Sequence, residues 1–586
     1  MALRFSQPPD SLSGAASTAM GSERPAVSPN YKWMALSNTT VGVLLATIDS
    51  SIMLIAMPDI FRGIRLNPLE PGNSFYLLWM ILGFLIVSSV LVVSLGRLGD
   101  IFGRVRMYNL GFVVFTVASL ILTVDPYTAE PGAVWLIAFR IVQGIGAAFL
   151  VANSAAILTD AFPANQRGLA LGINNVAGIS GSFIGLVVGG VLGAIDWRLV
   201  FLVSVPFGLF GTVWSYLSLR EVGERHRASI DWAGNITFAV GLILVMIGIT
   251  DGIQPANGHD MGWTSLPVLA LLAAGVVSLI AFVVIELRVM TPMFRLPLFA
   301  IRPFTFGTLS TFLSAIGRGG LMFMLIIWLQ GIWLPLHGYS FEETPLWAGI
   351  AMLPLTAGFL VAGPISGYLS DRLGSRYFAT GGMLGAALSF LLLMLLPIDF
   401  NYWVFAVILL FNGLSMGAFA SPNRAAIMNS LPARDRGAGG GMNATFQNSA
   451  QVLSIGIFFT LMIVGLSTTL STTMVQGLEQ HGVPAAVAAA VGHLPPVSIL
   501  FAAFLGYNPI QTLVGAQALA GLSPADRMEL TGHSYFSNLI SAPFHAGLRE
   551  AFIFAALMCL IAAAASWSRG GRFVVDKADA RARRQR

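Results

Sequence analysis

The sequence predicts an all-α polytopic membrane protein with 14 transmembrane helices, arranged as two pseudo-repeated six-helix bundles and an inserted two-helix hairpin. Three observations lead to this prediction. Of the 586 residues 56% are hydrophobic and only 10% are charged, whereas soluble domains average about 25% charged residues. The hydrophobic residues form 14 runs long enough to cross a bilayer core of about 30 Å as helices. Finally, two motifs recur in the two halves of the chain.

The hydrophobic runs assign the chain to consecutive segments. In order they are 33–58, 74–95, 107–124, 131–158, 168–193, 198–219, 231–251, 264–285, 304–330, 347–368, 377–396, 402–429, 438–466 and 550–568. Residues 33–219 form the predicted N-terminal bundle, 231–285 the hairpin and 304–568 the C-terminal bundle. The long outer loop, 467–549, is expected to form short amphipathic helices, and two further spans there are the less favoured alternative.

The basic residues predict how the chain is oriented. Cytoplasmic loops carry the excess of Lys and Arg. Alternating the runs from an inner N-terminus places 24 of the 32 basic residues inside, five outside and three within runs. Residues 1–32 lack the apolar core of a signal peptide and are expected to be a disordered cytoplasmic tail, and 569–586 a basic cytoplasmic tail. The high arginine content suggests a GC-rich bacterial genome, and hence the bacterial cytoplasmic (inner) membrane.

Two sequence motifs that occur in both halves of the chain indicate a duplicated bundle. The pattern G-x-L-x-D-x-x-G occurs at Gly96–Gly103 and again at Gly367–Gly374, an offset of 271 residues. Similar residues open the fifth run at Arg167–Asn174 and the thirteenth at Arg436–Asn443, an offset of 269. Repeats of this kind are typical of secondary transporters, whose substrate site lies between the halves near the membrane midplane.

Asp49 and Arg140 are charged residues inside the first and fourth runs. Ionisable groups at such positions are functional candidates because they are costly in a bilayer. At about 1.5 Å per residue, both lie about 13 Å below the predicted outer surface, so a direct or water-bridged pair is feasible. The pair is either a permanent structural ion pair, or a proton site in which Asp49 is neutral until Arg140 approaches.

The loop after the second run is a candidate gate. Gly96 and Gly103 allow a tight turn, and the charged residues Asp100 and Arg104 could hold the inner helix ends together in one state. Asp371 occupies the repeated position in the second half. The alternative is that the basic residues of this loop only fix the topology.

Several polar and aromatic residues are candidates for a substrate cavity. Arg318, among glycines in the ninth run, could meet an anion or a carboxylate there, or could only hydrogen-bond carbonyls at a helix break. The other candidates are Gln143, Asn174, Trp328, Phe446 and Gln447. The alternative for the aromatic residues is a lipid-facing position. The glycine stripe of the fifth run predicts close helix packing.

Other classes of function are excluded by composition. The single cysteine, Cys559, rules out an internal disulfide and a cysteine-based zinc cluster. Neither Lys32 nor Lys577 follows a glycine, which rules out a Walker A loop. No H-E-x-x-H pair and no catalytic triad signal occur, so we expect no enzyme, no metal site and no cofactor. The dispersed basic residues do not indicate nucleic-acid binding.

The motifs resemble those of the major facilitator superfamily, and within it the 14-span drug–proton antiporter subfamily. Gly96–Arg104 is similar to the superfamily's loop signature, and Arg140 with Gln143-Gly144 to the antiporters' span-4 motif. Asp49–Pro58 resembles the subfamily's span-1 motif, with Ser51 in place of Thr and Leu54 in place of Asn. The glycine stripe of the fifth run is also similar, with Gly189-Gly190 where Gly-Pro is common.

This resemblance implies a proton-coupled exporter of amphipathic or lipophilic small molecules that works by alternating access, with Arg140 acting in proton coupling. The alternatives are an exporter or importer of one specific physiological metabolite or lipid, and a non-transporting membrane sensor. The expected partners are the small-molecule substrate, protons and the lipid bilayer. A periplasmic adaptor protein could bind the long outer loop, 467–549.

Overall fold

The computed structural model describes residues 30–570, except for residues 68, 71, 164–165, 223–230, 257, 260, 291, 293, 433–434 and 506–507. It also leaves out the side chains of residues 74, 167–169, 371, 436 and 437. The predicted tails therefore lie outside the described residues, apart from 30–32 and 569–570. Tyr31 and Lys32, expected in the disordered tail, already belong to the first helix.

Fourteen helices of the described residues are long and apolar enough to cross a membrane. The N-terminal bundle consists of α1 (Tyr31–Ile64), α2 (Asn73–Phe102), α3 (Arg104–Thr123), α4 (Ala129–Ala161), α5 (Arg167–Ile195), and α6 (Leu199–Leu202) with α7 (Ser204–Ser218). The hairpin is α8 (Trp232–Ile253) and α9 (Leu266–Glu286), followed by the short 3₁₀ turn η1 (Leu296–Ala300). The C-terminal bundle consists of α10 (Arg302–Trp328) with η2 (Leu329–Trp333) and α11 (Leu334–Leu336), α12 (Thr344–Ala351) with α13 (Leu353–Leu373), α14 (Ser375–Met394), α15 (Tyr402–Asn429), α16 (Arg436–Ser467) and α23 (Tyr535–Ser568).

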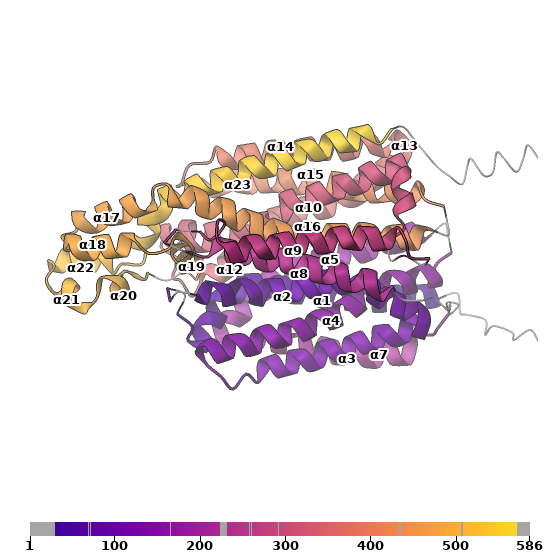
Figure 1. Ribbon diagram of the computed structural model, residues 1–586, viewed down its shortest axis with the longest axis horizontal. Helices are drawn as coiled ribbons and strands as arrows, with labels where there is room; N and C mark the ends of the chain where they lie inside the picture. The colour runs from indigo at the N-terminus through magenta and orange to yellow at the C-terminus, as the bar shows by residue number, and fades with distance from the viewer. Residues whose placement is uncertain are drawn as a thin grey trace, which may run out of the picture.

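The two bundles lie side by side with their helices roughly parallel (Figure 1). Within the N-terminal bundle α1 packs on α5, and α4 packs on both α2 and α3. Within the C-terminal bundle α15 packs on α13 and α14, while α10 packs on α16 and α23. The hairpin helix α8 contacts α2 of one bundle and α16 of the other, so the hairpin covers the seam between them. The predicted fold class is therefore confirmed.

The two ends of the molecule differ. α17 (Leu470–Gln480), α18 (Ala485–Gly492), α19 (Pro496–Phe504), α20 (Ile510–Val514), α21 (Ala516–Ala520) and α22 (Pro524–Leu530) form a cap that extends beyond one end (Figure 1). We call this the cap end, and we call the opposite end, where α1 begins and α23 ends, the terminal end. All nine residues of α19 are buried. Because α19 contacts α10 and α16 as well as α2, it covers the seam between the bundles at the cap end.

Several helices are longer than the hydrophobic runs that predicted them. α1 continues past Pro58 to Ile64, and α23 begins at Tyr535 rather than at residue 550. Pro58 removes one backbone donor and is tolerated within a long helix. Beyond it, Asp59 and Arg62 pair one turn apart at 2.6 Å. Hydropathy measures the thickness of the apolar layer, and these helices extend through it into polar surroundings.

Candidate functional site

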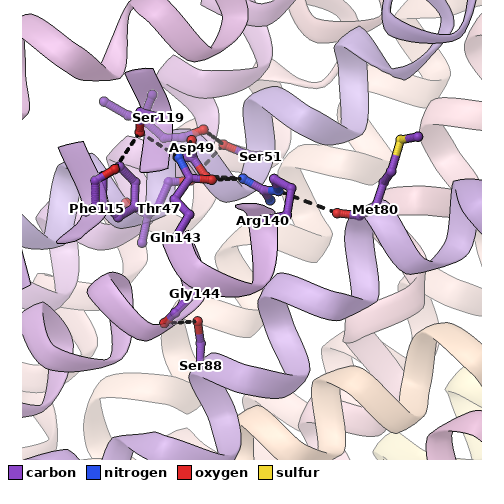
Figure 2. Close-up of polar contacts among 11 residues, drawn as sticks. Thr47, Asp49, Ser51, Met80, Ser88, Phe115, Ser119, Arg140, Gln143 and Gly144 are labelled. Atoms are coloured by element: carbon purple, nitrogen blue, oxygen red, sulfur yellow. Dashed lines mark hydrogen bonds and ion pairs between the residues drawn. The ribbon is translucent and has the colours of Figure 1, made fainter. Parts of the chain in front are cut away.

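Asp49 of α1 and Arg140 of α4 form an ion pair in the interior of the N-terminal bundle (Figure 2). Their side chains are 0% and 1% exposed. Gln143, one turn after Arg140, completes the arrangement: its Nε2 donates to Asp49 Oδ1 at 2.8 Å, and its Oε1 accepts from Arg140 at 2.7 Å. Gln143 therefore contacts both members of the pair and fixes their relative orientation.

A serine of α3 joins the same arrangement. Gln143 Nε2 also donates to Ser119 Oγ at 2.8 Å (Figure 2). The guanidinium of Arg140 lies over the ring of Phe84, 4.3 Å from its centroid. We call Asp49, Ser119, Arg140 and Gln143 the buried cluster. Its opposite charges compensate each other, which is the condition under which ionised groups persist in a dry interior.

Small residues bring the helices close enough for these contacts. A Cβ added at Gly185 of α5 would lie 2.1 Å from Ser51 Oγ, and one added at Gly144 of α4 would lie 2.8 Å from the carbonyl oxygen of Phe84. Glycine therefore lets α5 lie directly on α1 and α4 directly on α2. This is the packing that the glycine stripe of the fifth run predicts.

The duplication seen in the sequence extends to backbone conformation and hydrogen bonding. Gly103 and Gly374, which end the two copies of the loop motif, have φ of 110° and 102°, a region that favours glycine. In the N-terminal bundle Gln143 donates to Ser119. In the C-terminal bundle Asn412 of α15 donates to Ser389 of α14 at 2.6 Å. These residues are related by offsets of 269 and 270, so the C-terminal bundle holds a counterpart of half of the buried cluster.

The same offset of 269 relates Asp49 to Arg318 of α10 and Arg140 to Leu409 of α15. The surrounding contacts support this correspondence. Gly185 lies against Ser51. Their equivalents are also in contact, because Ser454 Oγ accepts from the backbone N–H of Gly320 at 2.8 Å. A carboxylate in one bundle is thus replaced by a guanidinium in the other. A comparison of residue types misses the correspondence between Asp49 and Arg318, because the two residues differ. Applying the offset of 269 residues to every candidate residue would have found it.

Arg318 lies within an unbroken stretch of α10. The helix irregularity expected near its glycines comes later, at the π-helical turn η2, Leu329–Trp333. Hydrogen bonding to carbonyls at a helix break, the alternative considered for Arg318, is therefore not what the structure has. The side chain is partly exposed to solvent.

The candidate gating loop makes its ion pairs within the N-terminal bundle. Arg104 donates to Asp100 at 2.8 Å and to Asp160 of α4 at 2.6 Å. Gly103 has the positive φ given above. Gly96 lies in α2, where an added Cβ would lie 3.7 Å from the Cβ of Ala152 in α4. The side chain of Asp371, the equivalent of Asp100, lies outside the described part of the chain.

The remaining cavity candidates lie in different surroundings. Trp328 is 1% exposed and packs against Phe400, Phe405 and Phe552 inside the C-terminal bundle. Asn174 is 6% exposed and donates to Ser154 of α4 at 2.7 Å. Phe446 of α16 contacts Phe294, Phe299 and Phe312, and Gln447 beside it is partly exposed. The structure therefore does not bring these four residues into one group.

Several contacts join the two bundles at the cap end. Arg62 of α1 pairs with Glu342, which precedes α12, at 3.4 Å. Gln330 Nε2 donates to the carbonyl oxygen of Ile55 at 3.3 Å. Nearer the terminal end, Arg424 of α15 donates to Asn175 Oδ1 of α5 at 3.0 Å. Together with the buried α19, the first two contacts close the seam at the cap end.

A metal centre is not indicated by the described residues, which contain no group of three or more His, Cys, Asp or Glu side chains able to hold a metal ion. Cys559 is buried within α23. What the arrangement offers chemically is a buried carboxylate with one cationic partner, and a second, separate cation at the equivalent place in the other bundle.

Comparisons with known proteins agree on one family. A family model described as "Major Facilitator Superfamily" matches residues 39–455. The riboflavin transporter RibZ of Clostridioides difficile is 28% identical over 73% of this chain and 87% of its own length. The tetracenomycin C resistance and export protein of Streptomyces glaucescens is 26% identical over 91% of this chain and 90% of its own. Further relatives are named as multidrug and drug-resistance proteins.

A solved structure shares the fold. The bacterial homologue of the human lysosomal transporter Spinster, solved in an inward-facing and unoccupied conformation, is similar with a TM-score of 0.54. It is 16% identical, and the alignment covers 93% of this chain and 98% of that one. At this identity the likeness concerns the fold alone.

Proposed function

The chain belongs to the major facilitator superfamily, and from this premise we propose that it is a proton-coupled transporter that exports amphipathic or lipophilic small molecules. The terminal end, which carries most of the basic residues, would face the cytoplasm of a bacterial cell and the cap end the periplasm. Both chain termini would then be cytoplasmic. The cap helices other than the buried α19 offer a surface for a periplasmic adaptor protein.

The buried cluster is the observation that carries the proposal. A carboxylate that is 0% exposed stays ionised at low cost only while a cation compensates it, and Asp49 has Arg140 as that cation. A rearrangement that separates α1 from α4 would leave Asp49 uncompensated and favour its protonation. Restoring the pair would expel the proton. Asp49 would thus bind one proton in one conformation and release it in the other.

The seam between the bundles supports alternating access. Its cap end is closed by the Arg62–Glu342 pair, by the Gln330 contact and by α19. Export would require these contacts to separate while the terminal end closes. Around the terminal end of α2, Asp100 and Arg104 would act as part of that inner gate, together with Asp371 in the second half. We propose the two bundles, 33–219 and 304–568, as the units that move.

The relatives support export and also an alternative. The protein of Streptomyces glaucescens that spans most of this chain is named for resistance and export. The relative named riboflavin transporter favours the alternative that one specific metabolite is the substrate. The two are separated by testing compounds that share amphipathic character but differ in structure.

The proposal is tested in proteoliposomes that contain the purified protein and an internal pH dye. We expect addition of an amphipathic substrate to drive counterflow of protons through the wild type and not through Asp49→Asn. Asp251→Asn is the matched control, because Asp251 lies in α8 of the hairpin, away from the buried cluster. Equal proton flow through the wild type and Asp49→Asn would refute the role of Asp49, and substrate movement without proton flow would refute coupling.

A further inference from the structure

Two arginines of the C-terminal bundle lie within membrane-spanning helices without an acidic partner. Arg318 is in the middle of α10, and Arg424 is near the terminal end of α15. Among the described residues no charged group interacts with either one. Arg424 donates to the neutral amide of Asn175, and within the described part of the chain Arg318 makes no hydrogen bond. An uncompensated charge in this position is costly, and its presence is by default a sign of function.

Among the described side chains in the membrane-spanning segments of the C-terminal bundle, none supplies an acid to either arginine. Glu550 of α23 is the one acidic residue whose side chain is described within these spans, and it is exposed. Asp371, near the terminal end of α13, has a side chain outside the described part of the chain. Glu550 lies little more than one turn beyond His545, whose ring nitrogen contacts the carbonyl oxygen of Leu396 in the loop after α14. Glu550 is therefore close to the cap end, whereas Arg318 and Arg424 are at mid-helix and near the terminal end.

The comparison between the bundles shows what is missing. Asp49, the equivalent of Arg318, is compensated by Arg140 across the gap between α1 and α4. In the C-terminal bundle Leu409 stands where Arg140 would be, and it is 0% exposed. The carboxylate that would compensate Arg318 at the mirrored place does not exist. A bound anion would supply the negative charge that Arg318 does not meet among the described residues.

Neither arginine is fully enclosed by other side chains. The side chain of Arg424 is exposed, and that of Arg318 is partly exposed. Asn423, next to Arg424, donates to Thr311 of α10 at 2.9 Å, which fixes the level of α15 relative to α10. Arg318 lies seven residues beyond Thr311, which is about 11 Å closer to the cap end. The two arginines therefore lie at different depths, Arg424 near the terminal end and Arg318 closer to the middle of the membrane.

We propose that Arg318 and Arg424 bind the negatively charged group of the substrate, and that amphipathic organic anions are the preferred substrate class. This inference rests on the proposed export function and adds the charge of what is exported. A guanidinium offers two parallel donors that match a carboxylate, sulfonate or phosphate. The same two charges repel lipophilic cations. Arg424 meets the anion first, and Arg318 holds it at the depth of the buried cluster, where the proton is bound.

Binding to the full-length protein in nanodiscs of zwitterionic lipid tests this inference without a proton gradient. The probes are anilinonaphthalene sulfonate and phenylnaphthylamine, which share the same rings and differ in the sulfonate. We expect saturable binding of the sulfonate to the wild type, at least about tenfold weaker in Arg318→Gln and weaker also in Arg424→Gln, because each loses a charge-assisted hydrogen bond. Arg318→Lys should recover part of the affinity, since it restores the charge without the second donor.

Controls separate this binding from other effects. Arg549→Gln removes an exposed arginine from α23 of the same bundle and should bind the sulfonate like the wild type. Binding of phenylnaphthylamine should not change in any variant. Arg318→Gln should melt at the same temperature as the wild type or higher, because it removes an uncompensated charge. A lower melting temperature would indicate that Arg318 supports the fold, and would overturn the inference.

Two further outcomes distinguish this inference from the proposed function. If neutral and cationic compounds are exported equally by the wild type and Arg318→Gln, and the sulfonate binds equally to both, the anion site is refuted while export stands. If no compound of any charge is exported but sulfonate binding is lost in Arg318→Gln, the export function is refuted while the anion site stands.

Discussion

The strength of the buried cluster can be measured by a double-mutant cycle on Asp49 and Arg140. Breaking a buried ion pair by removing one partner costs about 3–5 kcal/mol, because the other charge is left uncompensated. In Asp49→Asn, Arg140 keeps the Gln143 oxygen at 2.7 Å and the face of Phe84. In Arg140→Gln, Asp49 keeps mainly the Gln143 nitrogen at 2.8 Å. We therefore expect Arg140→Gln to lie at the upper end of this range and Asp49→Asn at the lower end.

The double variant decides between coupled and independent roles. With both charges removed, the remaining loss is that of two or three neutral hydrogen bonds, each worth about 1 kcal/mol. The free energy of unfolding of the double variant should thus exceed that of Arg140→Gln. Single costs of about 3 and 5 kcal/mol and a double-variant cost of about 2–3 kcal/mol give an interaction energy between the two sites of about 5 kcal/mol, above the roughly 0.5–3 kcal/mol usual for residues in contact.

The assay is reversible unfolding in mixed detergent micelles, titrated with SDS and followed by the fluorescence of the protein's 12 tryptophans. The Asp59–Arg62 pair serves as the control cycle. Its arginine side chain is 40% exposed, so its interaction energy should not exceed about 1 kcal/mol. If the costs of Asp49→Asn and Arg140→Gln simply add in the double variant, the two residues are not coupled, and the reasoning on proton binding at this pair fails.

Three further predictions follow from the geometry. Gly185→Ala should lower stability by about 1–3 kcal/mol in the same titration, because its Cβ would lie 2.1 Å from a serine hydroxyl of α1; Gly172→Ala, with nothing within 4 Å of its Cβ, should be neutral or stabilising. Gly374→Ala should lower stability by about 1–2 kcal/mol because of its φ of 102°, and an unchanged midpoint would contradict the strain. Arg62→Gln, which breaks the pair with Glu342, should increase labelling of cysteines introduced at the cap end of the seam while changing stability by less than about 1 kcal/mol; unchanged labelling would show that the pair does not hold the seam closed.

Much of the fold could be predicted from the sequence because the bilayer restricts the choice of structure. Once hydropathy identifies a membrane-spanning run, the backbone must be helical, and a run of about 20 residues fixes the position of each helix. The helix ends could not be predicted in the same way. Asp59 and Arg62 extend α1 through local polar contacts. The start of α23 is held by the cap, where Tyr535 Oη donates to the carbonyl oxygen of Gly477 in α17 at 3.0 Å. Such contacts depend on tertiary neighbours that hydropathy does not report.

The candidate site was likewise only partly predictable from the sequence. Two charged residues at similar depths, Asp49 and Arg140, could be predicted as a feasible pair because opposite charges inside a membrane have few other partners. The role of Gln143 as their common contact could not be predicted, because it depends on how α4 is rotated about its axis. For Trp328, residue type alone leaves a cavity position and a lipid-facing position open, whereas the structure packs it against Phe400 and Phe405 inside the bundle.

The difference between the two bundles suggests how one ancestral unit came to serve two tasks. Gln143 with Ser119, and Asn412 with Ser389, retain the same hydrogen bond, so the scaffold around the site changed little. What changed is the charge. In the N-terminal bundle a carboxylate and a guanidinium neutralise each other, which suits a site that takes up only a proton. In the C-terminal bundle Arg318 has no such partner, so it binds an anion more strongly than a paired arginine would. Because each bundle handles a different charge, a single rocking movement of one against the other can exchange a proton for an anionic substrate.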